Sequence, residues 1–79
     1  MSEKKVSILA IAVKDRLQAA PQVNALLSRY GDQIVARIGI PKNGLNLISV
    51  IIETTEDEID SITGKLKTID NVQVKTLTV

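Results

Sequence analysis

The segment at residues 34–53, IVARIGIPKNGLNLISVIIE, constrains the fold of this chain more than any other segment. Residues 33–40 have a period of two, which places Ile34, Ala36, Ile38 and Ile40 on one apolar face and predicts an edge strand. Residues 45–53 predict a second strand. The PKNG sequence between them predicts a turn, because proline presets φ and Asn-Gly accepts positive φ. We therefore expect a hairpin.

Apolar side chains occupy both faces of the returning strand, where a single buried face would need only every other position. One face carries Leu45, Leu47 and Ile51, and the other carries Ile48, Val50 and Ile52. Residues 5–13, KVSILAIAV, have the same property and predict another strand that is apolar on both sides. If helices cover one face of the sheet, the other face must meet a second molecule, a ligand or water.

Two helical patterns lie between the predicted strands. In the first, Pro21 fits the first turn of a helix that begins near Ala20, and Gly31 is the expected C-terminal cap. The apolar face of that helix comprises Ala19, Val23, Leu26, Leu27 and Tyr30. We expect the loop at residues 15–19 to lead into it.

The second helix begins at a capping box, in which the Thr55 hydroxyl and the Glu58 carboxylate satisfy free amides of the first turn. Its apolar face comprises Ile59, Ile62, Leu66 and Ile69. Gly64 within this helix is expected to allow close approach of another backbone. Asp70 and Asn71 then turn the chain into a last strand at residues 72–79.

The order β-α-β-β-α-β predicts an α+β, ferredoxin-like fold, with a four-stranded antiparallel sheet and both helices on one face. The first and third strands are central in this topology. At 79 residues the chain is expected to be one domain, residues 1–79, and its core is thin. We therefore expect the uncovered face to mediate assembly into a dimer or tetramer. The alternative is that a small sheet simply tolerates the extra aliphatic side chains.

Composition excludes several classes of function. The chain has no Cys and no His, which argues against disulfides, thiolate nucleophiles and zinc, nickel or iron sites, so no cofactor is expected. A net charge of +1 with interspersed signs predicts no direct contact with nucleic acid. The apolar run at residues 6–13 is too short for a signal-peptide core or a membrane span, which favours a cytoplasmic protein. No nucleophile and base pair is evident, so we expect no enzyme.

Four residues are candidates for ligand binding: Asp15, Arg16, Arg37 and Gly39. Asp15 and Arg16 follow a central strand and precede a helix whose free amides would hold a carboxylate, although Asp15 could equally be a local helix cap. Arg37 lies in mid-strand on the face of Val35 and Gly39. It is either an anion or partner contact at a subunit interface or a solvated residue that prevents unwanted strand pairing.

The KDR sequence after an apolar strand, followed by VNALLSRYGDQI, resembles ACT domains, which are small βαββαβ modules that commonly bind amino acids at subunit interfaces. Over residues 6–76, the motifs VKDR, QVNALL, RIGIP, TGKL and VQVKT resemble the short ACT-like proteins known as iron-only hydrogenase system regulators. These proteins are similar in fold to the C-terminal domain of the nickel-responsive repressor, whose His and Cys metal ligands have no counterparts here.

The resemblance implies a regulatory domain that senses a small effector, such as an amino acid or small anion. We hypothesise that the effector binds between subunits near the four candidate residues, shifts the assembly between states and is read by a partner protein. The family name points to transcriptional regulation, whereas the charge pattern predicts no direct contact with nucleic acid. The alternative is a protein interaction module without a ligand, docking through the last strand at residues 72–79.

Overall fold

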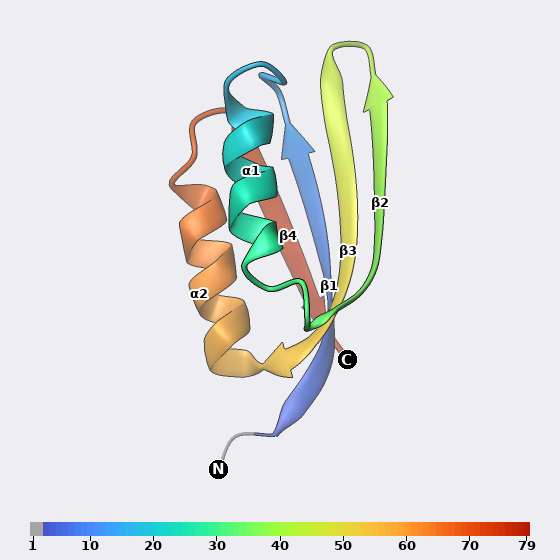
Figure 1. The fold of residues 1–79 in the computed structure, drawn as a ribbon, viewed down its shortest axis with the longest axis vertical. Coiled ribbons are helices and arrows are strands. Elements are labelled where there is room, and N and C mark those ends of the chain that lie inside the picture. Colours follow the sequence, from blue (N-terminus) through green and yellow to red (C-terminus); the bar gives the residue numbers. More distant parts are fainter. Residues whose placement is uncertain (1–2) are drawn as a thin grey trace.

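The computed structural model describes residues 3–79, which form six elements in the predicted order (Figure 1). They are β1 (Lys4–Val13), α1 (Ala19–Ser28), β2 (Ile34–Lys42), β3 (Leu45–Thr55), α2 (Glu56–Lys67) and β4 (Val72–Thr78). The strand order is β2-β3-β1-β4, with every neighbouring pair antiparallel. Both helices cover the same face of the sheet (Figure 1). The predicted α+β, ferredoxin-like fold is therefore confirmed, with β1 and β3 as the central strands.

The core lies between this sheet and the two helices. Alternate residues of the central strands point into it, since successive side chains of a strand point to opposite faces. Its buried apolar members are Leu9, Ile11, Val13, Ala19, Val23, Leu26, Leu27, Ile48, Val50, Ile52, Ile59, Ile62 and Leu66. Two buried polar residues, Ser7 and Thr54, bond through their hydroxyls to Thr78 Oγ1 at 2.9 Å and to Glu58 Oε2 at 2.9 Å. The helix side of the two central strands is therefore filled by the chain itself.

The end of α1 differs from the prediction. The helix stops at Ser28, with Arg29 as its C-cap, and not at a left-handed Gly31. The last turn tightens through bonds to carbonyls three residues back: Arg29 N–H to Leu26 O at 3.2 Å and Tyr30 N–H to Leu27 O at 3.0 Å. Such bonds satisfy the terminal carbonyls without a residue of positive φ. Gly31 is therefore not needed as a left-handed cap.

The start of α2 confirms the Thr55 half of the capping-box prediction, whereas the Glu58 carboxylate accepts a hydrogen bond from the Thr54 hydroxyl and not from an amide of the first turn. Thr55 is the N-cap, and its hydroxyl accepts a hydrogen bond from Glu58 N–H at 3.2 Å. Lys5 Nζ lies 2.6 Å from Glu56 Oε1, and this hydrogen bond, followed by the lysine's positive charge, lowers the pKa of the Glu56 carboxyl. The expectation for Gly64 is wrong. A Cβ added there would meet nothing within 4 Å, because Gly64 lies on the exposed side of the helix.

Removing the Thr55 cap is expected to destabilise the protein by about 1 kcal/mol, because one amide of the first turn of α2 loses its acceptor. The change is Thr55→Ala, and the measurement is the urea midpoint at fixed protein concentration. Thr55→Ser is the matched control because it keeps the hydroxyl, and it should remain near wild type. Equal losses in both variants would show that the methyl group matters and the cap does not.

The β2–β3 hairpin has a two-residue turn at Asn43 and Gly44, both with positive φ (52° and 80°). This is the arrangement that favours Asn-Gly in tight hairpins. The strand β2 continues through Pro41 to Lys42, two residues beyond the predicted end. Proline is tolerated there because β2 is an edge strand, where one side of the backbone needs no pairing.

The predicted apolar face of β2 is wrong at one end. The register shifts between Ile34, which pairs with Ile52, and Ala36, which pairs with Ile51. This irregularity inserts one extra residue, Val35, and so moves Ile34 to the opposite face from Ala36. Ile34 consequently packs against the core beneath the helices. The side chains of Ala36 and Ile38 point away from the helices, toward the uncovered face.

Candidate functional site

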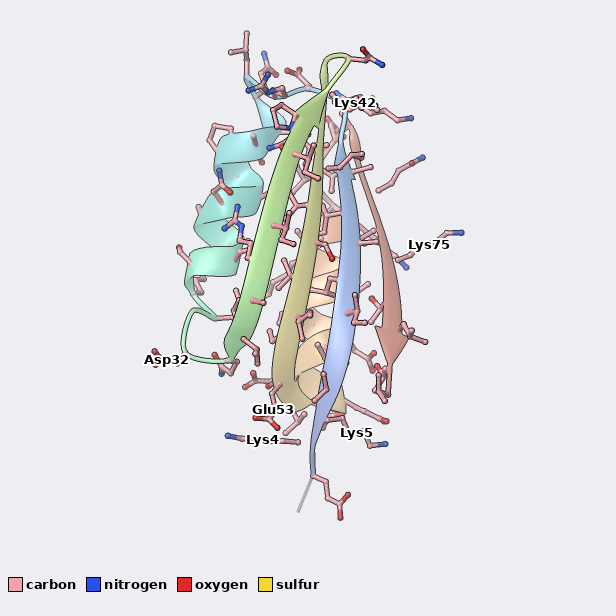
Figure 2. The ribbon with its side chains drawn as sticks, turned by 90° about the vertical axis from the view of Figure 1, so that its right-hand side faces the viewer. Lys4, Lys5, Asp32, Lys42, Glu53 and Lys75 are labelled. Carbon is pink, nitrogen blue, oxygen red and sulfur yellow. The ribbon has the colours of Figure 1, made fainter. Side chains whose placement is uncertain are left out.

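The face of the sheet without helices is apolar on β1, β2 and β3 and mixed on β4, and we call it the open face. Its apolar side chains are Val6, Ile8, Ala10, Ala12, Ala36, Ile38, Ile40, Leu45, Leu47, Ile51 and Leu77, as the strand pairings require. Ile38 is 61% exposed and Leu77 is 62% exposed. Figure 2 looks onto this face, with the strands in front and α2 behind them. The prediction that the central strands are apolar on both sides is confirmed.

The open face is hollowed along its centre. A hollow of about 930 Å³ lies over it, and its lining includes Ala10, Ala12 and Ser49 from the central strands and Ile38 and Ile40 from β2. On the central strands Ala10, Ala12 and Ser49 are small and Leu47 is large, and Ile38 and Ile40 of the outer strand are also large.

Charged side chains frame the open face. Lys42 lies at the hairpin end of the sheet, Glu53 lies toward the opposite end, and Lys75 lies on the outer strand β4 (Figure 2). The register puts all three on the open side, because each is paired with a residue that points to that side. Lys42 pairs with Leu45, Glu53 with Val6 and Lys75 with Ala10. Within residues 3–79 neither Lys42 nor Glu53 forms an ion pair. The rim therefore carries charges of both signs that the chain itself does not neutralise.

Asp15 and Arg16 lie in the loop between β1 and α1. The Asp15 carboxylate accepts a hydrogen bond from Gln18 N–H at 3.3 Å, and its carbonyl accepts one from Ala19 N–H at 2.8 Å. Asp15 also lines a polar hollow of about 160 Å³ together with residues 68–71. This geometry supplies the local helix contact that was one of the two interpretations of Asp15. Ligand binding at Asp15 and the exposed Arg16 stays a prediction.

Arg37 and Gly39 lie on β2, on the side of the sheet that faces the helices. They pair with Val50 and Ile48, both of which point into the core. The Arg37 guanidinium donates a hydrogen bond to Asn24 Oδ1 on α1. A Cβ added at Gly39 would meet nothing within 4 Å, so the space above this residue is open. Arg37 therefore faces α1 and is not part of the open face.

The four predicted site residues form two separate pairs. Asp15 and Arg16 are neighbours in one loop, and Arg37 and Gly39 are neighbours on one strand, but no hydrogen bond or ion pair among the described residues joins the pairs. Sequence reasoning missed Lys42 and Glu53 as functional candidates. Lys42 and Glu53 each fall on the same alternate positions of their strands as the apolar residues of the open face. Only the true register shows that these positions share one face.

Among residues 3–79 no group of three or more acidic side chains is placed to hold a metal ion. No helix in this range is long and apolar enough to cross a membrane.

Comparison with known proteins gave one family match and several similar structures. The model of the TM1266-like family, described as "Iron-only hydrogenase system regulator, putative", matches residues 5–76. The uncharacterized protein TM1266 from Thermotoga maritima is 38% identical, with 98% of this chain and 99% of that chain covered and a TM-score of 0.94. A search of curated proteins gave no significant match.

More distant structures share the fold at low sequence identity. The ACT domain from GTP pyrophosphokinase of Chlorobium tepidum is 18% identical, with 94% of this chain and 99% of that chain covered and a TM-score of 0.82. The C-terminal domain of the MgtC protein from Mycobacterium tuberculosis is 10% identical, with 95% and 87% covered and a TM-score of 0.77. The ACT-like resemblance seen in the sequence is therefore confirmed for the fold.

Proposed function

Because this chain belongs to the TM1266-like family of iron-only hydrogenase system regulators, we propose that it is a cytoplasmic, non-catalytic regulatory domain that acts as a homo-oligomer. In this proposal a small effector, such as an amino acid or small anion, binds at a subunit interface and shifts the assembly between states. A partner protein of the hydrogenase system reads the change. The coupling requires only that the effector binds one state more tightly than the other.

The single observation that carries the proposal is the apolar open face. A soluble monomer rarely exposes a contiguous apolar surface of this kind, and one that is framed by charge marks an interaction site. Ile38, Ile40 and Leu77 are each more than half exposed there. Covering these side chains with a second subunit would add apolar burial to a thin core, which is how small domains commonly gain stability.

The two residue pairs offer polar groups to an effector outside the open face. The guanidinium of Arg37 has five donors, so its bond to Asn24 leaves others available for an anion. The open space above Gly39 leaves room beside it. The loop at Asp15 and Arg16 precedes the free amides of α1, which attract negative charge. A partner subunit would have to bring the two pairs together around one ligand.

A thermal-shift screen against amino acids and small anions tests the effector. A ligand at one hundred times its dissociation constant should add about 2.7 kcal/mol, and each kcal/mol moves the melting midpoint of a domain this size by about 4–8 °C. Arg37→Ala should reduce the shift without unfolding the protein, since Arg37 is exposed. Arg29→Ala, which removes an exposed arginine at the end of α1, is the matched control.

An unchanged ligand response in Arg37→Ala would remove Arg37 from the site. No shift with any compound would contradict effector sensing and favour the second candidate function, a docking module without a ligand. One observation supports that candidate: the edge strand β4 has no proline, glycine or register shift, whereas the other edge strand β2 has all three. An edge without such features is open to pairing with another strand.

A further inference from the structure

We infer that two copies of this chain stack open face on open face about a two-fold axis that runs across the strands, which places Lys42 of one copy against Glu53 of the partner subunit. This inference rests on the proposed function, because it specifies how the proposed homo-oligomer is built. Three properties of the open face support it: its exposed apolar side chains, the position of its charges and its area.

The register divides the open face into rows that run across the strands. The central row is Ile38, Ser49, Ala10 and Lys75. The next row toward the hairpin is Ile40, Leu47, Ala12 and Gln73, and the next row away from the hairpin is Ala36, Ile51, Ile8 and Leu77. An axis along the central row would lay each of these two flanking rows over the other in the partner subunit.

Under this symmetry, large side chains meet small ones on β2 and β1, whereas Leu47 lies over the partner's Ile51 and Gln73 lies over the partner's Leu77. Ile40 of one copy lies over the partner's Ala36, and Ala12 lies over the partner's Ile8. In the central row each residue lies over its own counterpart in the partner subunit, so Ile38 meets the partner's Ile38 and the hollow at Ala10 and Ser49 is enclosed between the two copies. An axis along the strands would instead lay β2 over β4 and bring Lys75 onto the partner's Ile38. That arrangement would bury a charge against an apolar side chain, which is costly.

Lys42 and Glu53 favour this axis, which also places Lys75 near the partner's Lys75. Lys42 pairs across the hairpin with Leu45, which lies four residues before Ser49 in β3 (49 − 45 = 4). Glu53 lies four residues after Ser49 in the same strand (53 − 49 = 4). A two-fold axis at the Ser49 row therefore exchanges these two ends of the sheet. Each dimer gains two symmetric Lys42–Glu53 contacts at its rim. Within residues 3–79 of one copy, neither of these side chains forms an ion pair. Rim charges of this kind set orientation and register more than affinity.

The area of the face reaches the minimum for a specific dimer. Four strands spaced about 4.8 Å apart are about 19 Å wide, and the eight residue steps from Leu45 to Glu53 extend over about 27 Å. The projected area of the face is therefore about 500 Å² per copy, without the additional surface of the protruding side chains. Two copies together reach the lower range of specific interfaces, which begins near 1,000 Å².

The test is a charge exchange measured by sedimentation equilibrium at low ionic strength. Lys42→Glu and Glu53→Lys each place like charges together at both contacts and should weaken the dimer about 10-fold. The double variant restores both contacts and should return within about 2-fold of wild type. Within one chain the two residues lie about 27 Å apart, so such a rescue requires a second copy. The matched control is Asp57→Lys with Lys65→Glu on α2, which should leave association unchanged.

Lys75 offers an independent measurement, because the axis brings it near the partner's Lys75 at the rim. Lys75→Gln should tighten the dimer about 3-fold at low salt, with the gain lost near 1 M salt. A wild-type dimer whose single charge variants do not weaken, or whose double variant is not rescued, would overturn this stacking and leave the homo-oligomer standing. A wild-type protein that stays monomeric at millimolar concentration would overturn both the stacking and the homo-oligomer.

Discussion

Ile38→Glu is expected to convert the assembled protein into a monomer while leaving its fold intact. Ile38 lies in the central row of the open face and is 61% exposed, so glutamate is well solvated in the isolated chain. In the stacked dimer, the same position would bury two carboxylates near the two-fold axis, without a partner of opposite charge. An uncompensated buried charge costs several kcal/mol, which corresponds to a loss of more than about 100-fold in affinity.

Sedimentation velocity over a range of protein concentrations measures this change, and circular dichroism checks the fold. Leu17→Glu is the matched control, because it makes the same kind of change at a residue that is 90% exposed in the loop before α1. The control should associate like wild type. If Ile38→Glu also associates like wild type, the open face is not the assembly surface. If Leu17→Glu dissociates as well, an added negative charge alone is responsible.

Leu66→Ala is expected to destabilise the protein by about 2–5 kcal/mol, because it leaves a cavity where α2 packs on the sheet. Leu66 is completely buried and belongs to the core that both helices share. A domain of 79 residues has a total stability of roughly 4–12 kcal/mol, so the loss is a large fraction of the whole. The melting midpoint should fall by at least about 8 °C.

Urea denaturation and thermal melting at one protein concentration measure this loss, since dissociation of an oligomer would otherwise change the apparent stability. Leu17→Ala removes the same atoms from an exposed side chain and should change stability by less than about 0.5 kcal/mol. Similar effects in the two variants would contradict the assignment of Leu66 to the core, because burial alone distinguishes them.

The local patterns of the sequence predicted most of the fold. The period of two in residues 5–13 and 45–53 and the helical spacing after Thr55 depend only on which neighbouring side chains share a face. The Asn43-Gly44 turn and the Thr55 cap are also local, because each is formed by residues at most three positions apart. These features are sufficient for the order of elements, the central strands and an apolar open face.

The candidate site was less predictable. Asp15 and Arg37 each look like ligand contacts when they are considered alone, yet the structure gives them different neighbours, Gln18 and Asn24. Their neighbours depend on how α1 lies across the sheet. Lys42 and Glu53 gave no signal as a pair, because they are eleven positions apart in the sequence (53 − 42 = 11) and at opposite ends of one face.

The sequence by itself determined that this chain alternates strands and helices as a βαββαβ unit, and that its sheet has more apolar positions than two helices can cover. Only the tertiary structure decided which side chains share the open face. The register shift after Ile34 moves that residue into the core and leaves Ala36, Ile38 and Ile40 on the other side. The physical reason is that strand register is set by pairing between distant segments, and a slip of one residue reverses every side chain that follows it.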